Sequence, residues 1–345
     1  MRLRSALVAL PLIVVPLIGA TACSSGSSST SNDSGASSPA SSSAAATLGP
    51  QVPAATAVAA PVPAASLPTA TGAFGQKPAL TFPSSAPPPS LQRVVLSEGT
   101  GPVTKKGDWL ITNYLGQVWG GKVFDNSYDR KATSAFQIGA GKVVPGWDVA
   151  LAGVPVGSRV LLSLPPADGY GSAGSASAGI TGTDTIVFVV DIVRAISPSA
   201  GGQPDATPKA APKTGPQVTG KLGVAPKVTI PAGTAEPTKP VVTVLATGTG
   251  APVKAGNVLA QYVAVTWAGK PDGSSWPDPK VAATGSGGTG PQELPVAASG
   301  PLAGLVGVPL GSRVLVQVPA QQDTSGQPQA AVALVVDLLA QTTTT

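Results

Sequence analysis

The chain has 345 residues, of which 42 are glycine and 37 are proline, and its formal net charge is +5. Aromatic residues make up 4% and charged residues 11%, both low for one compact domain, so part of the chain is expected to lie outside any domain. Histidine is absent, which excludes a Ser-His-Asp hydrolase, a Cys-His protease and a histidine-ligated metal site. The single cysteine excludes an intrachain disulfide, a cysteine-rich zinc site and an iron–sulfur cluster. The positive charge is dispersed and forms no basic stripe of the kind that binds nucleic acid.

Residues 1–22 have the pattern of an export signal. Two arginines precede an apolar run over residues 6–18, and small residues complete the segment. The run is interrupted by prolines and is too short for a membrane-spanning helix. Cys23 follows directly, and this arrangement resembles a bacterial lipoprotein signal, in which that cysteine receives a diacylglyceryl group. We therefore expect a signal peptide over 1–22 and an extracytoplasmic protein anchored to the cell membrane through lipidated Cys23. The alternative is an ordinary secretory signal with an incidental cysteine.

Residues 23–73 are expected to form a tether. Serine, alanine, threonine, glycine and proline dominate this segment, and Asp33 is its only charged residue. No apolar periodicity is present, so the segment cannot bury enough surface to offset the entropy of ordering. We predict a disordered tether that is flexible where serine predominates and stiffer where proline accumulates.

The remaining sequence contains an internal repeat with an offset near 150 residues. Several strings recur in order, namely Leu80–Pro83 as Val228–Pro231, Asn113–Tyr114 as Gln261–Tyr262, and Val154–Leu161 as Val308–Leu315. Each copy is long enough to hold one hydrophobic core. We predict domains over 74–196 and 221–341, joined by a proline-, lysine- and alanine-rich linker over 197–220.

Each copy is predicted to be mostly β-structure. In the first copy, β-branched and aromatic runs are bounded by glycine, proline and aspartate, as is typical of strands. Residues 145–154 differ, because their apolar residues recur at helical spacing, with proline at the start and glycine near the end. The fold class is therefore predicted to be α+β, with two domains that each wrap an antiparallel β-sheet around one short helix.

A set of short strings in the first copy occurs in a characteristic order over residues 90–196. They are Gly107–Gly116, Gly121–Ser127, Phe136–Gly139, Val143–Trp147, Val156–Arg159, Pro165–Gly171 and Val187–Asp191. In this order and spacing they resemble the FKBP-type peptidyl-prolyl cis-trans isomerases. The resemblance implies an FKBP-like fold, isomerisation of X-Pro bonds without a cofactor or metal, and binding of proline-containing polypeptides and of the family's macrolide inhibitors.

The resemblance also implies a proline-binding pocket in the first copy. Its residues are Tyr114, Phe124, Asp125, Val143, Val144, Trp147, Tyr170 and Phe188. Trp147 would form the floor, aromatic side chains the walls, and the Tyr170 hydroxyl would donate to a substrate carbonyl. Rotation about an X-Pro bond has a barrier of about 18–20 kcal/mol. A pocket of low polarity favours the twisted amide, which has less charge separation than the planar one. The alternative for these aromatic residues is ordinary core packing.

The second copy keeps Tyr262 and the strand strings but lacks most of the implied pocket. The expected replacements are Trp276-Pro277 for Phe124-Asp125, Gly300-Pro301 for Gly146-Trp147, Asp323–Ser325 for Gly169–Gly171, and Leu334 for Phe188. We therefore expect a folded but degenerate domain, and the alternative is a divergent active enzyme.

Three functions are consistent with these features. The first is a membrane-tethered peptidyl-prolyl isomerase that assists the folding of exported proteins through its first domain. The second is a non-catalytic lipoprotein that binds peptides or proteins on the same scaffold, and the third is a purely structural surface lipoprotein. An isomerase assay on the first domain distinguishes the first function from the others.

Overall fold

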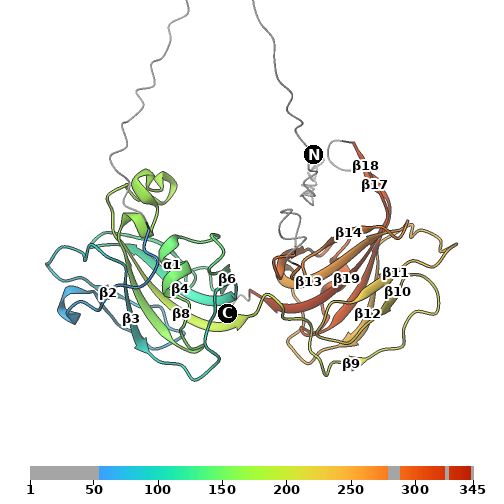
Figure 1. The fold of residues 1–345 in the computed structure, drawn as a ribbon, viewed down its shortest axis with the longest axis horizontal. Coiled ribbons are helices and arrows are strands. Elements are labelled where there is room, and N and C mark those ends of the chain that lie inside the picture. The colour runs from blue at the N-terminus through green and yellow to red at the C-terminus, as the bar shows by residue number, and fades with distance from the viewer. Residues whose placement is uncertain (1–53, 279–287, 323–325, 343–345) are drawn as a thin grey trace, which may run out of the picture. The chain divides into compact units, whose positions relative to one another are not determined.

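The structure is a computed structural model that describes residues 54–278, 288–322 and 326–342. The predicted signal peptide and Cys23 lie outside the described residues. Strands dominate the described part, and its helices are few and short (Figure 1). None of these helices is long and apolar enough to cross a membrane. We describe the chain as a first region, residues 54–196, and a second region, residues 197–342.

The first region is built on a six-stranded antiparallel sheet in the order β3-β7-β8-β4-β5, with β6 also pairing with β4. Its strands are β3 (Gln92–Ser97), β4 (Trp109–Val118), β5 (Val123–Asn126), β6 (Ser134–Gln137), β7 (Arg159–Leu164) and β8 (Ile186–Ile196). The helices are α1 (Pro145–Ala150) and four single-turn 3₁₀ segments, namely η1 (Ala64–Ser66), η2 (Pro166–Asp168), η3 (Gly171–Ala173) and η4 (Ala176–Ala178).

Helix α1 packs against one face of this sheet. Pro145 occupies its first turn, where a missing backbone N–H costs nothing. Trp147 and Ala150 are buried on the side that meets the sheet, together with Leu151 directly after the helix. They share one apolar cluster with inward-facing strand residues such as Leu162. The burial of these side chains positions the helix over the centre of the sheet.

The opposite face of the sheet is covered by a small hairpin of β1 (Thr69–Ala70) and β2 (Leu80–Thr81). Leu80 and Phe82 pack on Leu161, Val187 and Val189 of this outer face. Residues 186–192 of β8 are consequently buried without interruption, as expected for a strand that is covered on both faces.

The second region is built on a seven-stranded antiparallel sheet in the order β14-β13-β19-β16-β12-β9, with β15 also pairing with β13. Its strands are β9 (Thr207–Pro208), β12 (Val241–Thr247), β13 (Gly256–Thr266), β14 (Pro271–Ser274), β15 (Gln292–Val296), β16 (Arg313–Val318) and β19 (Val332–Gln341). The smaller elements are β10 (Gln217–Thr219), β11 (Lys227–Thr229), η5 (Ala303–Leu305), β17 (Gln321–Gln322) and β18 (Pro328–Gln329).

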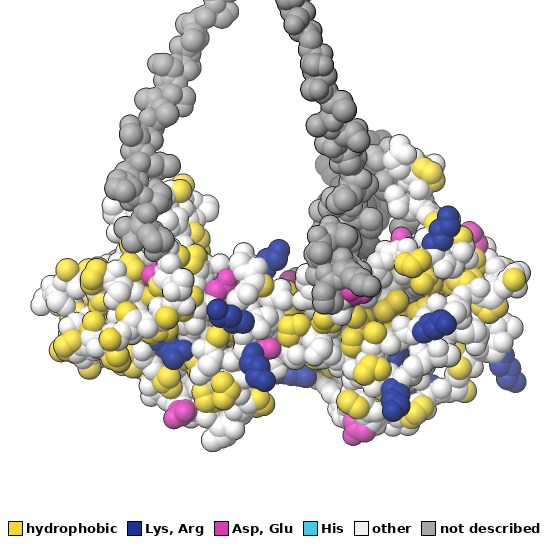
Figure 2. Space-filling view, viewed as in Figure 1, with side chains coloured by type: hydrophobic (Ala, Val, Ile, Leu, Met, Phe, Trp, Pro, Cys, Tyr) yellow, Lys and Arg dark blue, Asp and Glu magenta, His cyan; other side chains and the backbone are white. Residues whose placement is uncertain are grey.

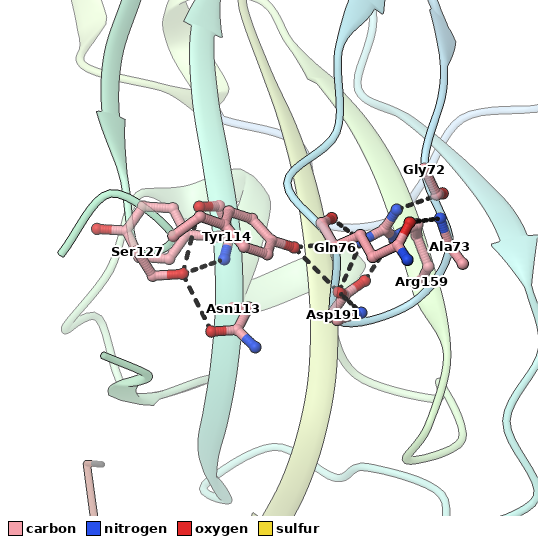
Figure 3. Close-up of polar contacts among 10 residues, drawn as sticks. Gly72, Ala73, Gln76, Asn113, Tyr114, Ser127, Arg159 and Asp191 are labelled. Atoms are coloured by element: carbon pink, nitrogen blue, oxygen red, sulfur yellow. Dashed lines mark hydrogen bonds and ion pairs between the residues drawn. The ribbon is translucent and has the colours of Figure 1, made fainter. Parts of the chain in front are cut away.

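A buried arginine–aspartate pair ties the covering hairpin to the sheet in each region. Arg159 donates from Nε and Nη2 to the carboxylate of Asp191 at 2.6 and 2.7 Å (Figure 3). The same guanidinium donates to the carbonyl oxygens of Gly72 and Gln76 in the hairpin turn. In the second region, Arg313 pairs with Asp337 and donates to the carbonyl oxygens of Lys221 and Val224, in the turn between β10 and β11.

Two segments differ from the expectations of composition. Within the predicted tether, Ala55 donates its backbone N–H to Asp168 Oδ1 at 2.6 Å, and Leu67 is buried. Within the predicted linker 197–220, β9 pairs with β12 and β10 pairs with β11. These contacts are made by backbone groups, which bond the Asp168 carboxylate in the first segment and neighbouring strands in the second, and a pattern of side chains cannot reveal them. The domain boundaries inferred from the sequence stay a prediction.

Candidate active site

Five aromatic rings meet where α1 faces the six-stranded sheet. Trp147 lies 5.7 Å from Tyr114, 5.1 Å from Phe136 and 5.0 Å from Phe188 between ring centroids, each pair edge-to-face. Phe124 meets Phe188 at 5.6 Å with an interplanar angle of 90°. Tyr114, Trp147 and Phe188 are buried, whereas Phe124 and Phe136 are only partly buried. We call these five residues the aromatic cluster.

The close approach of Phe124 and Phe188 depends on Gly116 in the middle of β4. A Cβ atom at this position would lie 2.6 Å from Phe124 Cζ and 2.7 Å from Phe188 Cε1. Contacts this short do not occur between real side chains, so the absence of a side chain at Gly116 lets the two rings meet over the strand.

A polar network of three residues adjoins the aromatic cluster. The Tyr114 hydroxyl donates to Asp125 Oδ2, and Arg130 donates from Nη1 to Asp125 Oδ1 and from Nη2 to the Tyr114 oxygen, the last at 2.8 Å. The Arg130 guanidinium also lies 5.5 Å from the centroid of the Tyr114 ring. Asp125 keeps 42% of its side chain exposed, so one carboxylate borders both the aromatic cluster and solvent.

This environment raises the pKa of Tyr114 to about 12. The largest cause is burial, which penalises the ionised form, and the hydrogen bond to Asp125 raises the pKa further while Arg130 opposes it. Tyr114 therefore keeps its proton at neutral pH and remains a donor to Asp125.

The structure brings six of the eight predicted pocket residues into one place and leaves two at its margin. Val143 and Val144 pack against the same buried core as Trp147, directly before α1. Tyr170 lies on the turn between η2 and η3 and is 40% exposed. Burial, and to a smaller extent the negative charge of Asp125, raise the pKa of Tyr170. Asp125 itself lies at the solvent edge of the aromatic cluster.

Two residues of the site were missed from the sequence. Arg130 lies in a turn after β5 and forms an ion pair with Asp125. A single arginine in a polar turn gives no sequence pattern from which this pairing could be predicted. Phe136 lies on β6, two residues after Ser134 and therefore on the same face of the strand. Its ring lies 5.5 Å from Tyr114, so alternation along β6 places this aromatic side chain toward the cluster.

The second region does not assemble a comparable cluster among its described residues. The strand register pairs Ala264 with Leu334 where Gly116 pairs with Phe188. Gly300 and Pro301 precede η5, where the first region has Gly146 and Trp147 at the start of α1. Residues 323–325, predicted to replace Gly169–Gly171, lie outside the described residues.

One predicted replacement in the second region is wrong. Ser127 Oγ accepts from Tyr114 N at 2.9 Å (Figure 3). Ser275 Oγ accepts from Tyr262 N at 2.7 Å in the same way, so these two serines correspond. Counting back from them, Asp272 and Gly273 replace Phe124 and Asp125. Trp276-Pro277 follows Ser275 and therefore lies outside the corresponding strand. The sequence comparison matched Trp276 to Phe124 because both are aromatic. Burial raises the pKa of Asp272.

A family model for FKBP-type peptidyl-prolyl cis-trans isomerases matches residues 101–193, which include every predicted pocket residue. An FK506-binding protein of Streptomyces anulatus is 37% identical over 119 residues, which are 34% of this chain and 96% of that protein. The chain belongs to the FKBP-type peptidyl-prolyl cis-trans isomerase family.

Other FKBP-type relatives share only part of their length with this chain. FkpA of Escherichia coli K12 is 36% identical over 118 residues, and the match spans 42% of FkpA. A solved peptidyl-prolyl cis-trans isomerase of Pseudomonas syringae pv. tomato is 27% identical, with a TM-score of 0.28, and the match covers 30% of this chain and 74% of that chain. The family match lies within the first region.

The raised pKa of Tyr114 leads to a prediction for alkaline stability. Folding favours the neutral hydroxyl, so the resulting stabilisation is fully present below pH 10 and is lost as the pH rises from about 10 through 12. Replacing Tyr114→Phe removes this dependence. The difference in unfolding free energy between the wild type and the variant should therefore shift by about 2 kcal/mol across this interval, measured by urea denaturation. A constant difference from pH 9 to 12 would contradict the prediction.

Proposed function

We propose that the chain isomerises X-Pro bonds at the aromatic cluster of the first region. The observation that carries this proposal is the set of edge-to-face rings around Trp147, bordered by a carboxylate that is partly exposed. Such a surface suits a prolyl ring and excludes water from the adjoining amide. The family membership of the chain supports the same activity.

In this proposal, catalysis needs no covalent step and no proton transfer. The prolyl ring packs on Trp147, with Phe124, Phe136 and Phe188 around it. The twisted amide of the transition state has less charge separation than the planar amide, so apolar surroundings lower the barrier of about 18–20 kcal/mol. The backbone N–H of Val144, for which no described residue is an acceptor, binds a substrate carbonyl. Asp125, held by Tyr114 and Arg130, tunes the polarity of the site.

The Tyr170 hydroxyl provides a direct test of substrate contact. It makes no hydrogen bond with the described residues, and its ring is 40% exposed, so Tyr170→Phe removes one donor at little cost to packing. We expect kcat/KM for an X-Pro peptide to fall about five- to tenfold in a protease-coupled assay, with an unchanged melting temperature. An unchanged rate in the folded variant would mean that the hydroxyl has no part in binding the transition state.

The place of action proposed here is the outer side of the cell membrane. The support is the signal-like segment 1–22 followed by Cys23, and the clients would be exported polypeptides that contain proline. Two or three acyl chains hold a protein at a bilayer far more firmly than one. Replacing Cys23→Ser should therefore move the protein from the membrane pellet to the soluble fraction, as seen by fractionation and immunoblotting. A processed Cys23→Ser protein that stays in the pellet would contradict the lipid anchor.

The second region is proposed to be a degenerate FKBP-like domain. The paired contacts of Arg313 and Asp337, Ser275 and Tyr262, and the β10–β11 hairpin repeat those of the first region. With Asp272 and Leu334 in place of two phenylalanines, the described residues of this region form no comparable aromatic cluster, which favours a non-catalytic role in binding or support. On the face visible in Figure 2, Lys and Arg are interspersed with acidic and uncharged side chains, so nucleic acid is not proposed as a partner.

A further inference from the structure

The outer edge of the six-stranded sheet is an exposed apolar strand. β3 lies at the end of the strand order, and Val94, Val95 and Leu96 are 36%, 42% and 38% exposed. An edge strand presents unpaired backbone donors and acceptors, and proteins commonly protect such edges by charge, proline or a covering segment. Among the described residues no strand pairs with β3 on this side.

The corresponding edge of the second region is occupied by an extended segment of the chain itself. β9 pairs antiparallel with β12, with Pro208 opposite Ala246 and Thr207 opposite Thr247. The Lys209 backbone N–H donates to the Leu245 carbonyl oxygen at 2.8 Å. The strand β9 therefore extends this sheet by main-chain hydrogen bonding.

Gln203 fixes the start of this segment. Its backbone N–H donates to the Gly311 carbonyl oxygen at 2.8 Å. Its side-chain Oε1 accepts from Thr249 N at 2.9 Å and from Thr249 Oγ1 at 3.0 Å. The glutamine side chain passes directly over Gly311, where a Cβ atom would lie 2.9 Å from Gln203 Oε1. One glutamine thus makes three hydrogen bonds to two residues of the edge.

The framework that receives this segment recurs in the first region, contact by contact. Gly248 N donates to Ser312 Oγ at 2.9 Å, and Gly99 N donates to Ser158 Oγ at 2.9 Å. Gly250 N donates to the Leu310 carbonyl oxygen and Gly101 N to that of Val156, both at 3.0 Å. Each edge strand has a register shift at the same place, and these shifts are centred on Leu96 and Leu245.

Two receiving residues of β3 are more exposed than their counterparts in β12. Ser97 is exposed while Ala246 is buried, and Leu96 is more exposed than Leu245. A Cβ atom at Gly157 would meet only Gly99 and Thr100 within 4 Å, so the path taken by glutamine over Gly311 is open here. Thr100 and Thr249 are both exposed, but Thr249 bonds to Gln203 whereas Thr100 makes no hydrogen bond to a described residue.

We propose that the β3 edge is a second peptide-binding site, which takes an extended, proline-containing segment of another polypeptide as an added strand. The segment places a glutamine amide over Gly157 and on Thr100, and its following residues pair with Leu96 and Ser97. The occupant is defined by the segment Gln203–Lys209, whose docking on the equivalent edge supplies every contact. The site is formed by residues outside the aromatic cluster, so it holds a client without taking part in isomerisation.

Glu98 gives the β3 edge a preference of its own. Glu98 on the β3 edge corresponds to Thr247 on the β12 edge, and Thr247 lies opposite Thr207. A bound segment with lysine or arginine at that position would form a cross-strand pair of opposite charges, which stabilises antiparallel strands modestly. The β3 edge therefore favours a bound segment with a basic residue four positions after its glutamine.

The test uses the full chain and a fluorescent synthetic peptide with the sequence of residues 200–210, titrated by anisotropy to about 1 mM protein. We expect saturable binding that weakens about tenfold in Thr100→Val and about tenfold when the peptide glutamine is replaced by leucine. Thr249→Val, the matched change on the occupied edge, should leave the affinity unchanged. A peptide with lysine in place of Thr207 should bind about threefold more tightly, and Glu98→Gln should remove this gain.

Several outcomes would overturn the proposal. No saturable binding at this concentration would remove the site, and equal affinity for the leucine peptide would remove the glutamine contact. Sensitivity to Thr249→Val but not to Thr100→Val would show that the peptide exchanges with the chain's own segment in the second region. Self-association of the full chain that Thr100→Val abolishes would make a second copy the occupant instead. Isomerase activity should be the same in wild type and Thr100→Val, so loss of peptide binding is separable from loss of catalysis.

Discussion

Replacing Trp147 by alanine should reduce isomerase activity at least a hundredfold and also destabilise the first region. Trp147 is 3% exposed and contacts three other rings, so truncation removes the proposed floor of the site and leaves a cavity. Truncating a buried aromatic side chain costs about 3–5 kcal/mol of stability. The rate must therefore be measured where the variant is folded, with kcat/KM from the protease-coupled assay beside the urea denaturation curve.

Two further variants separate catalysis from packing. Trp147→Phe keeps an apolar ring and should retain a measurable fraction of the activity. Trp267→Ala removes a tryptophan that is 9% exposed in the second region and should lower stability without changing kcat/KM. If Trp147→Ala, shown to be folded, isomerised the test peptide at the wild-type rate, the aromatic cluster would be core packing alone.

Replacing Asp191 by asparagine should lower the unfolding free energy of the first region by about 3–5 kcal/mol. Arg159 and Asp191 are buried at 3% and 0% side-chain exposure. Asp191 also accepts from the Tyr128 hydroxyl at 2.9 Å and from Gly75 N at 2.6 Å. Asparagine leaves the Arg159 charge uncompensated, and its amide replaces one of the two acceptor oxygens by a donor, so part of these hydrogen bonds is lost. Unfolding in urea measures the loss.

The second region offers the matched variant, Asp337→Asn. Arg313 and Asp337 are equally buried and have the same geometry. Hydrogen exchange should show faster opening of β7 and β8 in Asp191→Asn, and of β16 and β19 in Asp337→Asn. Destabilisation below about 1 kcal/mol in both variants would mean that the pairs are not needed to hold the hairpins on the sheets.

The sequence predicted the first region better than its surroundings. Strand runs and the helical spacing after Pro145 give both the sheet elements and α1, because side-chain periodicity records which face is buried. Family strings gave Tyr114, Trp147 and Phe188, whose rings the structure brings together. Side-chain periodicity is therefore most informative where burial determines the pattern, whereas the role of these rings in catalysis stays a proposal.

Features that depend on backbone pairing were not predictable in this way. The strand β9 and the contacts of residues 54–67 leave no apolar pattern, since they are made largely by backbone N–H and carbonyl groups of these segments. Arg130 contacts Asp125 and Tyr114 because of the conformation of the turn that carries it, and the sequence does not specify that conformation. The replacement of Phe124 by Asp272 needed the strand register, because a shift of a few residues is invisible when aromatic residues are few.

The central claim is that isomerase activity belongs to the first region. It is tested most directly by kcat/KM on one X-Pro peptide for two fragments, residues 54–196 and residues 197–342. The second fragment begins at 197 so that it keeps β9 and β10 with their partners. We predict that 54–196 has the activity of the full chain, and that 197–342 unfolds cooperatively on heating and gives no acceleration. Comparable acceleration by 197–342, or none by a folded 54–196, would contradict this account.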